Sequence, residues 1–424
     1  MSEPVLIRGG IVFDGTGSRR ADIGVSNGII VDPADAPTSA KVIDATECVV
    51  STGLVDLHAH LGEPGDEAAE TMATAGRAAV LGGFTTVLAM PNTLPPVDSA
   101  AVVEHVRVLA EAALCNVEPA GTITVGGQGK HLAPLGELAA VGVRFVSDCG
   151  PGVQDPLLLR RALEYAKPFD LTIAQPANCE ALSVGAQMHE GEWSSRLGLT
   201  GSPAEAEEIM VMRDISLARL TGVRVHFQTL STASSFAMVG AAQRSGVRVS
   251  AEVASHHLLL SDADVADYDT NKKVEPPFRP AADVDAARSA VGDQLVDCVV
   301  SDHTPHTTDR KERPFDHAEV GSIGLETALA VALSADIAIE DVLRAMSWRP
   351  AELLGVGGPA VRNLTVGSIA DITVIDPKEK FTVSNSLQQS AGTNGAFEGS
   401  TLRGTVRATL VGGDLVVDEG IVTK

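Results

Sequence analysis

Short runs rich in apolar and β-branched residues recur through the middle of the chain, and a turn and a helical stretch follow most of them. Two helical stretches are clear: residues 157–167, and a segment reaching about Gly222 with Ser202 as its N-cap and Pro203 in its first turn. Eight strand–helix units in roughly 300 residues predict an α/β fold, built as a (β/α)8 barrel. The eight runs fall at 54–60, 83–90, 117–125, 143–148, 171–177, 223–229, 247–254 and 298–302.

Both ends of the chain carry a different pattern. Residues 4–50 and roughly 365–424 hold short strands of alternating apolar and polar residues separated by glycine turns. This pattern is typical of a small β-sandwich, which both termini would build together beside the barrel. We therefore predict a first part of the sandwich at 1–53, the barrel at 54–363 and the second part of the sandwich at 364–424.

The composition adds no further fold information, but it excludes some classes of binding partner. With 44% hydrophobic and 21% charged residues, the 424-residue chain has the composition of a globular protein. Its net charge of −23 repels phosphate backbones and anionic lipids, so nucleic acid and membranes are poor partners. We expect a cytoplasmic protein, because no uninterrupted apolar run approaches the ~18 residues of a membrane span. Five cysteines without paired spacing indicate reduced thiols.

A candidate metal site joins the first and last predicted strands. His58 and His60 are two positions apart, so the period of a strand places both imidazoles on one face at the strand's carboxyl end. Asp302 ends the eighth strand, which lies beside the first once a barrel closes. Two imidazoles and a carboxylate are ligands that zinc accepts. These three side chains are therefore predicted to converge on a metal ion.

Motifs along nearly the whole chain resemble those of the dihydroorotase family of the amidohydrolase superfamily. They are, in order, DLHAHLGEPGDEAAET, GGFTTVLAMPNTLPP, GEWSSRLGLTGSPAEAEE, AEVASHHLLL, PPFRP, DCVVSDHTPH and GSIGLETAL. The resemblance implies a barrel flanked by a sandwich, with a zinc pair in the barrel mouth. It also implies hydrolysis, or formation, of the cyclic amide of dihydroorotate in pyrimidine biosynthesis.

The resemblance assigns the first metal to residues that this chain retains. His58, His60 and Asp302 match its ligands, and Asp302 also matches the general base that carries a proton to the leaving amide. The family's bridging aspartate lies in an Asp-Asp-Gly turn, which here reads Asp148-Cys149-Gly150. Cys149 therefore matches the bridging position, and its thiolate is a donor that zinc accepts.

The second metal has lost the ligands that the resemblance implies. Asn178 and Thr229 stand where the family has histidines, and neutral amide and hydroxyl groups bind zinc weakly. His226 does not replace them, because an odd separation from Thr229 points it to the opposite face of its strand. No lysine lies in the predicted barrel strands to act as a bridge. We predict at most one zinc per chain, held by His58, His60, Cys149 and Asp302.

The substrate pocket has also changed. Gly62 replaces the arginine that, by the resemblance, clamps the substrate carboxylate, and a charge-assisted bond of about 1.5–3 kcal/mol is lost with it. Glu275 replaces an asparagine that contacts substrate, and its charge repels an anionic one. Asn92 and His306 match family contacts and are predicted to bind substrate.

Two hypotheses follow from these departures. In the first, the chain is a weakly active or non-catalytic pseudoenzyme that scaffolds aspartate transcarbamoylase, a role that the resemblance allows. In the second, it is an active cyclic amidohydrolase with a single metal, in which water activated by the metal attacks the amide and Asp302 moves the proton. Glu275 would then favour a neutral or cationic substrate.

Three further questions stay open in the sequence. A hydantoinase-like or allantoinase-like activity is disfavoured, because those relatives need a bridging lysine. The charged loop 307–320 follows the eighth strand and is long enough to cover the pocket, but a mobile surface loop explains it equally well. A homodimer is the default expectation for the oligomeric state.

Overall fold

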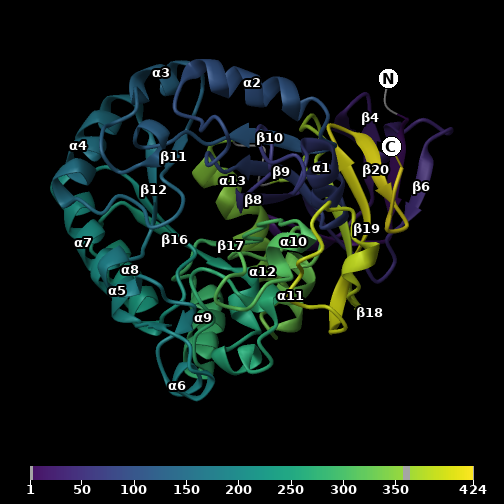
Figure 1. The fold of residues 1–424 in the computed structure, drawn as a ribbon. Coiled ribbons are helices and arrows are strands. Elements are labelled where there is room, and N and C mark those ends of the chain that lie inside the picture. The colour runs from purple at the N-terminus through teal and green to yellow at the C-terminus, as the bar shows by residue number, and fades with distance from the viewer. Residues whose placement is uncertain (1–2, 357–362, 424) are drawn as a thin grey trace.

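The eight predicted strands are present and form a closed parallel barrel in the order of the chain (Figure 1). In the computed structural model, which describes residues 3–356 and 363–423, they lie in two hydrogen-bonded sheets. The sheets join where Gly121 N donates to Phe145 O (3.0 Å) and where His60 N donates to His303 O (2.8 Å). The strands are β8 (Leu54–Ala59), β9 (Phe84–Ala89), β10 (Asn116–Pro119), β11 (Phe145–Ser147), β12 (Thr172–Pro176), β15 (Val225–Gln228), β16 (Val249–Ala254) and β17 (Cys298–Val300).

Helices surround the barrel, as its alternating pattern predicts. Those that follow the first seven strands are α1 (Met72–Leu81), α2 (Ala100–Ala110), α3 (Leu135–Ala140), α4 (Pro156–Ala166), α7 (Glu205–Thr221), α8 (Ala233–Arg244) and α9 (Ala281–Gly292). After β17 come α10 (Thr308–Lys311), α11 (Ala328–Ser334), α12 (Ile339–Leu343), a π-helical turn (Arg344–Trp348) and α13 (Arg349–Leu354). An excursion after β12 contains α5 (Glu180–Ser183), β13 (Met188–His189), α6 (Glu192–Leu197) and β14 (Gly201–Ser202).

One predicted helix start is wrong. Ser202 does not cap α7, whose N-cap is Ala204. Ser202 instead pairs with His189 in the β13–β14 ladder, and its carbonyl accepts the Glu190 amide at 2.9 Å. Its backbone therefore belongs to a strand that ends three residues before the first helical residue, Glu205. The predicted acidic first turn is present, with Glu205, Glu207 and Glu208 near the positive end of the helix.

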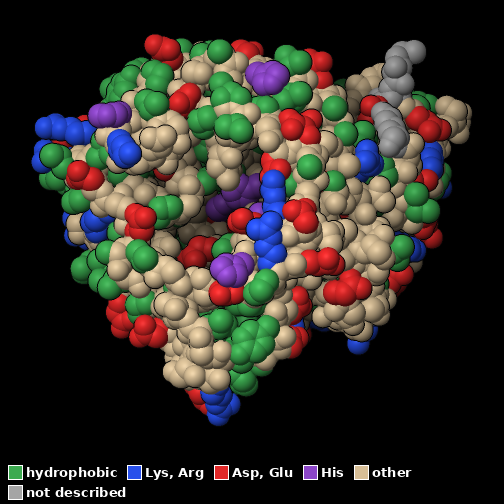
Figure 2. Space-filling view, in the orientation of Figure 1, with side chains coloured by type: hydrophobic (Ala, Val, Ile, Leu, Met, Phe, Trp, Pro, Cys, Tyr) green, Lys and Arg blue, Asp and Glu red, His purple; other side chains and the backbone are tan. Residues whose placement is uncertain are grey.

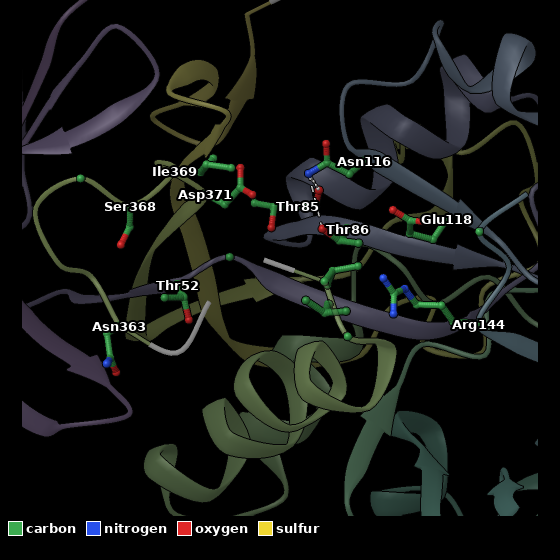
Figure 3. A pocket seen from close by; sticks show the side chains of 16 residues that line it. Thr52, Thr85, Thr86, Asn116, Glu118, Arg144, Asn363, Ser368, Ile369 and Asp371 are labelled. Atoms are coloured by element: carbon green, nitrogen blue, oxygen red, sulfur yellow. Dashed lines mark hydrogen bonds between the residues drawn. The ribbon is translucent and has the colours of Figure 1, made fainter. Parts of the chain in front are cut away.

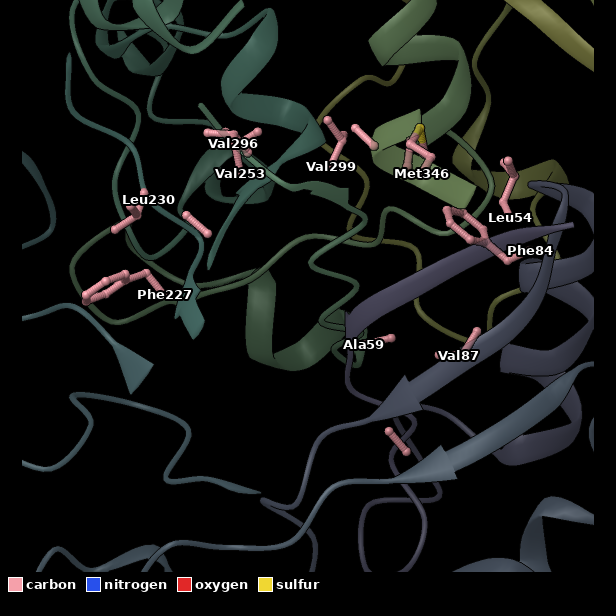
Figure 4. Packing of buried hydrophobic residues seen from close by; sticks show 14 of the residues in the cluster. Leu54, Ala59, Phe84, Val87, Phe227, Leu230, Val253, Val296, Val299 and Met346 are labelled. Atoms are coloured by element: carbon pink, nitrogen blue, oxygen red, sulfur yellow. The ribbon is translucent and has the colours of Figure 1, made fainter. Parts of the chain in front are cut away.

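Strand periodicity decides which side chains enter the barrel. In β16, Val249, Ala251 and Val253 belong to the apolar layer between strands and helices, part of which Figure 4 shows. The alternate residues Ser250 and Glu252 are polar and buried on the other face, inside the barrel. The single acidic residue of this apolar strand is thereby fixed at the centre of the molecule.

Both termini build the predicted sandwich beside the barrel. A four-stranded sheet contains β1 (Val5–Arg8), β4 (Ile23–Ser26), β5 (Ile29–Val31) and β6 (Lys41–Asp44). A seven-stranded sheet contains β2 (Ile11–Asp14), β3 (Gly17–Arg20), β7 (Val49–Thr52), β18 (Ile372–Thr382), β19 (Thr401–Val411), β20 (Asp414–Asp418) and β21 (Ile421–Val422). Residues such as Val5, Val50 and Ile372 form their shared apolar core.

The predicted domain boundaries at 53/54 and 363/364 stay predictions. Residues 1–2, 357–362 and 424, which belong to the predicted parts, lie outside the described residues. Within the segments 3–356 and 363–423, no helix combines the length and the apolar character needed to cross a bilayer.

Cavities lie at both ends of the barrel. The larger, of about 610 Å³, separates the amino ends of the strands from the sandwich and is lined by Thr85, Asn116, Glu118, Arg144 and Asp371 among others (Figure 3). A smaller one, of about 150 Å³, opens at the carboxyl ends. Enzymes with this fold place their active sites at the carboxyl ends, so the smaller cavity is the candidate site.

Candidate metal centre and active site

The site is a hollow at the carboxyl ends of the strands, with histidines inside it and basic side chains beside its opening (Figure 2). Loops after β8, β9 and β17 line its wall. The lining includes the sequence-predicted residues His60, Gly62, Asn92 and His306, together with Asp66. Residues from three separate parts of the chain therefore meet in one hollow.

His58, His60 and Asp302 converge as predicted. One ligand atom of each lies within 4.8 Å of those of the other two, and no other such group of three or more potential ligands occurs among residues 3–356 and 363–423. His58 is on β8 and His60 follows it, while Asp302 lies two residues beyond β17 with φ 51°. The backbone bond from His60 N to His303 O ties the two ligand-bearing segments together.

In both His58 and His60, Nδ1 has a hydrogen-bond partner, which leaves Nε2 as the atom that can bind a metal. His58 Nδ1 lies 2.6 Å from Glu252 Oε1, and its Nε2 faces Asp302 Oδ1 at 3.8 Å. His60 Nδ1 lies 2.7 Å from Asn92 Oδ1. Because both acceptors are oxygens, each Nδ1 carries the proton. Such partners fix the tautomer and orientation of metal-binding histidines.

Glu252, which sequence reasoning missed, connects two buried imidazoles. Its Oε2 lies 2.9 Å from His226 Nε2, and His226 Nδ1 lies 2.8 Å from Ser250 Oγ. Burial raises the pKa of Glu252, but the charges and hydrogen bonds of His58 and His226 together outweigh burial and hold that pKa below its usual value. Both ring nitrogens of His226 therefore have partners, and His226 supports the ligand His58 through Glu252. The signal in the sequence was a lone glutamate in an apolar strand.

Burial and neighbouring charges set the pKa values of the metal group. Burial lowers the pKa of His58, but the charges of Glu252 and Asp302 and the hydrogen bond to Glu252 raise it to about 9. Burial raises the pKa of Asp302 to about 7, although the charge of His58 opposes the rise. Burial, aided by the charge of His58, lowers the pKa of His60 to about 3, so its imidazole is neutral. A neutral imidazole is the form that binds a metal.

A third imidazole approaches Asp302 from the other side. His256 Nε2 lies 3.7 Å from Asp302 Oδ2, is buried, and has no hydrogen-bond partner in the part of the chain that the structure describes. Burial keeps its pKa well below the usual value, so the ring is neutral. Asp302 therefore lies between two imidazoles, one on each oxygen.

Cys149 is not part of the convergent group. Its half-buried Sγ lies 4.0 Å from Ser147 Oγ, and the group of mutually close ligand atoms does not include it. Burial raises the pKa of the thiol to about 12. The neighbouring Asp148 anchors the turn, because its carboxylate accepts hydrogen bonds from the amides of Ile123 and Thr124. The structure thus brings together three of the four predicted ligands.

Asn178, at a position predicted to have lost the second metal, binds Glu275, at a position predicted to contact substrate. Asn178 Nδ2 donates to Glu275 Oε1 at 3.3 Å, and Thr229 is buried with φ 46°. The residue Glu275 is exposed, yet desolvation of its carboxyl by the surrounding protein raises its pKa to about 7, while Arg279 opposes this rise. An amide–carboxyl pair therefore stands where the resemblance places a metal ligand and a substrate contact.

The backbone explains the glycine at position 62. Gly62 has φ 75°, and a Cβ there would lie 2.3 Å from Glu70 O, so no side chain fits without a shift. The nearby guanidinium belongs to Arg310, which donates to both oxygens of Asp66 at 2.5 and 2.8 Å. The cation at the edge of the hollow is therefore already paired with a carboxylate.

The loop 307–320 is folded around two buried ammonium groups. Lys311 Nζ donates to Glu319 O and Gly321 O, and Lys273 Nζ donates to Phe315 O and Ala318 O, all at 2.8–2.9 Å. His306, at the start of this segment, directs Nε2 to Val320 O at 2.8 Å. These contacts, with the Arg310–Asp66 pair, fasten the loop beside the hollow.

Comparison with known proteins places this geometry in a family. Residues 47–235 match the family model described as Dihydro-orotase-like. The dihydroorotase of Pelotomaculum thermopropionicum is 41% identical over 99% of both chains. Those of Mycobacterium tuberculosis and Mycobacterium leprae are 43% and 44% identical, over 98% and 89% of this chain and 99% and 90% of theirs.

Solved structures agree on the fold. The L-hydantoinase (dihydropyrimidinase) of Arthrobacter aurescens superposes with a TM-score of 0.87 at 23% identity, over 100% of this chain and 98% of that one. A dihydropyrimidinase of Brevibacillus agri gives 0.83 at 22% identity, over 99% and 96%. At these identities the likeness extends to the architecture alone.

Proposed function

Because the chain belongs to the dihydroorotase family of the amidohydrolase superfamily, we propose that it is an active, metal-dependent cyclic amidohydrolase. The reaction is the opening or closing of the dihydroorotate ring. The observation that carries the proposal is the convergence of His58, His60 and Asp302 at the barrel mouth. The non-catalytic hypothesis has no support among the relatives, which are named as dihydroorotases.

The three converging side chains fit one zinc ion. Two imidazoles with Nδ1 bound, of which His58 would give up its second proton when a metal takes Nε2, and one carboxylate form the donor set of catalytic zinc sites, in which a fourth position stays open. Bound there, the metal would polarise the amide carbonyl and make water a better nucleophile. Asn178 and Thr229 add no strong donor, and the eight strands as described contain no lysine. We propose one metal per chain.

The chain's own residues would orient the substrate and move one proton. Asp302 takes a proton from the attacking water and returns it to the ring nitrogen that leaves. The Asn92 amide nitrogen is available to the substrate, because only its oxygen is used by His60. Cys149 would need a local shift to act as the fourth ligand, because its Sγ is not among the converging ligand atoms. His306 lines the hollow, where we propose that it contacts substrate.

Other predictions remain proposals without direct support. Aspartate transcarbamoylase as a partner follows from the family resemblance alone. The division into residues 1–53, 54–363 and 364–424 is proposed unchanged.

Metal content and turnover test the function. We expect about one zinc per chain in protein purified without chelator, because the described residues contain a single strong donor set. Dihydroorotate turnover should disappear on chelation and return with zinc. Elemental analysis and an assay in both directions measure these outcomes. Metal-free protein without turnover after zinc addition would contradict the proposal, and two zinc ions per chain would contradict the single site.

Replacing Glu275 by Asn tests its effect on substrate charge. The negative charge of Glu275 repels the carboxylate of dihydroorotate, but not dihydrouracil, which has the same ring without a carboxylate. We expect Glu275→Asn to raise the ratio of kcat/KM for dihydroorotate over dihydrouracil about tenfold, equivalent to ~1.4 kcal/mol. Glu340→Gln, which removes a charge from the exposed side of α12, is the control and should leave the ratio unchanged. An unchanged ratio in Glu275→Asn would show that Glu275 does not face the substrate.

A further inference from the structure

The cavity of about 610 Å³ at the amino ends of the barrel strands takes no part in the site at the carboxyl ends. Strands β8, β9 and β10 contribute to its barrel wall, and the segment that leads into β18 contributes to its sandwich wall (Figure 3). Its volume lies within the ~300–1,000 Å³ typical of small-molecule sites. Three of its described lining residues are charged: Glu118, Arg144 and Asp371.

Glu118 and Arg144 point into the cavity from neighbouring segments of the barrel wall (Figure 3). Glu118 is on β10 and Arg144 precedes β11, and the bridge between Gly121 and Val146 fixes the register of the two segments. Neither side chain has a hydrogen-bond or ion-pair partner within residues 3–356 and 363–423. A Cβ on Gly355 would lie 3.2 Å from Arg144 Nη1, so the glycine leaves room for the guanidinium. Each of the two charges can therefore bind an opposite charge of a ligand.

The third charge, Asp371, lies on the sandwich wall (Figure 3). Its Oδ1 accepts the amide of Gly412 at 2.7 Å, and its backbone carbonyl accepts the amide of Gly53 at 2.9 Å. Its Oδ2 has no hydrogen bond in the part of the chain that the structure describes. Burial raises the pKa of Asp371, and a cation bound beside Oδ2 would offset that desolvation.

The charges of the lining define the charges of a matching ligand. One guanidinium and two carboxylates are complementary to one carboxylate and two cations. The planar fork of Arg144 suits a carboxylate, and Glu118 near it suits the α-ammonium group that an amino acid carries beside its carboxylate. Asp371, on the other wall, suits a second cation at the end of a side chain. The net charge of −23 also attracts a ligand that is positive overall.

We propose that this cavity binds a dibasic α-amino acid, such as lysine, ornithine or arginine. Arg144 holds the carboxylate of the ligand, Glu118 holds its α-ammonium group, and Asp371 holds the cation of its side chain. The aliphatic part lies against the apolar side chains of Val55 and Val356, which also line the cavity. Because the ligand contacts both walls, it stabilises the junction between the barrel and the sandwich.

Three probes test the charge pattern. L-Lysine should bind the full chain in calorimetry and raise its unfolding temperature, because a ligand that binds only the folded state stabilises it. L-Norleucine is lysine without the side-chain ammonium, and cadaverine is lysine without the carboxylate. Each loses one charge-assisted contact and should bind at least about tenfold more weakly. Norleucine or cadaverine binding as tightly as lysine would overturn the charge pattern, and dissociation constants above ~10 mM for lysine, ornithine and arginine alike would overturn the site.

Substitutions at the two walls locate the ligand. Arg144→Met should weaken lysine binding at least about tenfold and leave cadaverine binding unchanged, because cadaverine has no carboxylate. Asp371→Asn should weaken lysine binding to the same extent and leave norleucine binding unchanged. Both variants should fold, since Arg144 has no side-chain partner to lose in the described segments and the asparagine keeps an oxygen for the Gly412 amide.

Arg161→Met, which removes an exposed arginine from α4, is the matched control and should bind lysine as wild type does. Lysine binding by Arg144→Met as tight as that by Arg161→Met would overturn the assignment of Arg144. Calorimetry requires no turnover, so failure of this inference and failure of the proposed function are separate results.

Discussion

Asp302→Asn is expected to lower kcat for dihydroorotate by about 10²–10⁴-fold, the range that a positioned general acid–base supplies. The substitution keeps the size of the side chain but removes its charge and its ability to take up a proton. Asp302 is also the only carboxylate of the convergent group, so zinc content should fall in the same variant. Turnover and elemental analysis on the same preparation measure both effects.

Asp66→Asn is the matched control for this change. Asp66 lines the same hollow, but its carboxylate binds Arg310 and is not among the mutually close ligand atoms. Its zinc content should be that of wild type, and its kcat should stay within a few-fold. Turnover of Asp302→Asn within tenfold of wild type, with a folded barrel by circular dichroism, would remove Asp302 from the reaction.

Glu252→Ala is expected to lower the free energy of unfolding by about 3–5 kcal/mol, as breaking a buried charged pair does. Glu252 is fully buried and is the shared acceptor of His58 and His226. Without it, two imidazoles in the barrel interior lose their partner. His58 also loses the group that orients its ring, so zinc affinity should fall about 10–100-fold. Denaturant unfolding and a zinc competition titration measure the two losses.

Ser250→Ala separates the two effects of this network. It removes only the distant hydroxyl, which contacts His226 Nδ1 and not His58. We expect a cost of about 1 kcal/mol and an unchanged zinc affinity. If Glu252→Ala binds zinc as tightly as wild type, the glutamate supports the core without positioning His58.

The fold could be predicted because it depends on local periodicity. The apolar runs at 54–60 and 247–254 correspond to β8 and β16 within one or two residues, since each has a turn on either side. The start of α7 was misplaced because Ser202 and Pro203 are equally suitable for a helix cap and for the end of a short strand. The ladder with His189 decides between them, and that partner lies in a separate segment.

The convergence of site residues could be predicted only for residues at the ends of strands whose neighbours in the barrel are known. His58, His60 and Asp302 converge because the first and eighth strands of a barrel are neighbours. Cys149 lies in a turn, and the direction of its side chain depends on how Asp148 binds the amides of Ile123 and Thr124. No local pattern encodes that contact, which spans more than 20 positions.

Because the metal ligands lie on both sides of the junction between β8 and β17, the metal site is completed late in folding. Asp56 accepts hydrogen bonds from Ser301, which is 245 positions away, and His60 N donates to His303 O beside it. During synthesis, His58 and His60 emerge long before the carboxylate that completes their set. A nascent chain therefore holds only two of the three donors until the last barrel strand docks against the first. The complete donor set exists only in the folded barrel, so zinc binding is coupled to folding. Zinc would therefore stabilise the completed barrel and would not stabilise shorter folding intermediates.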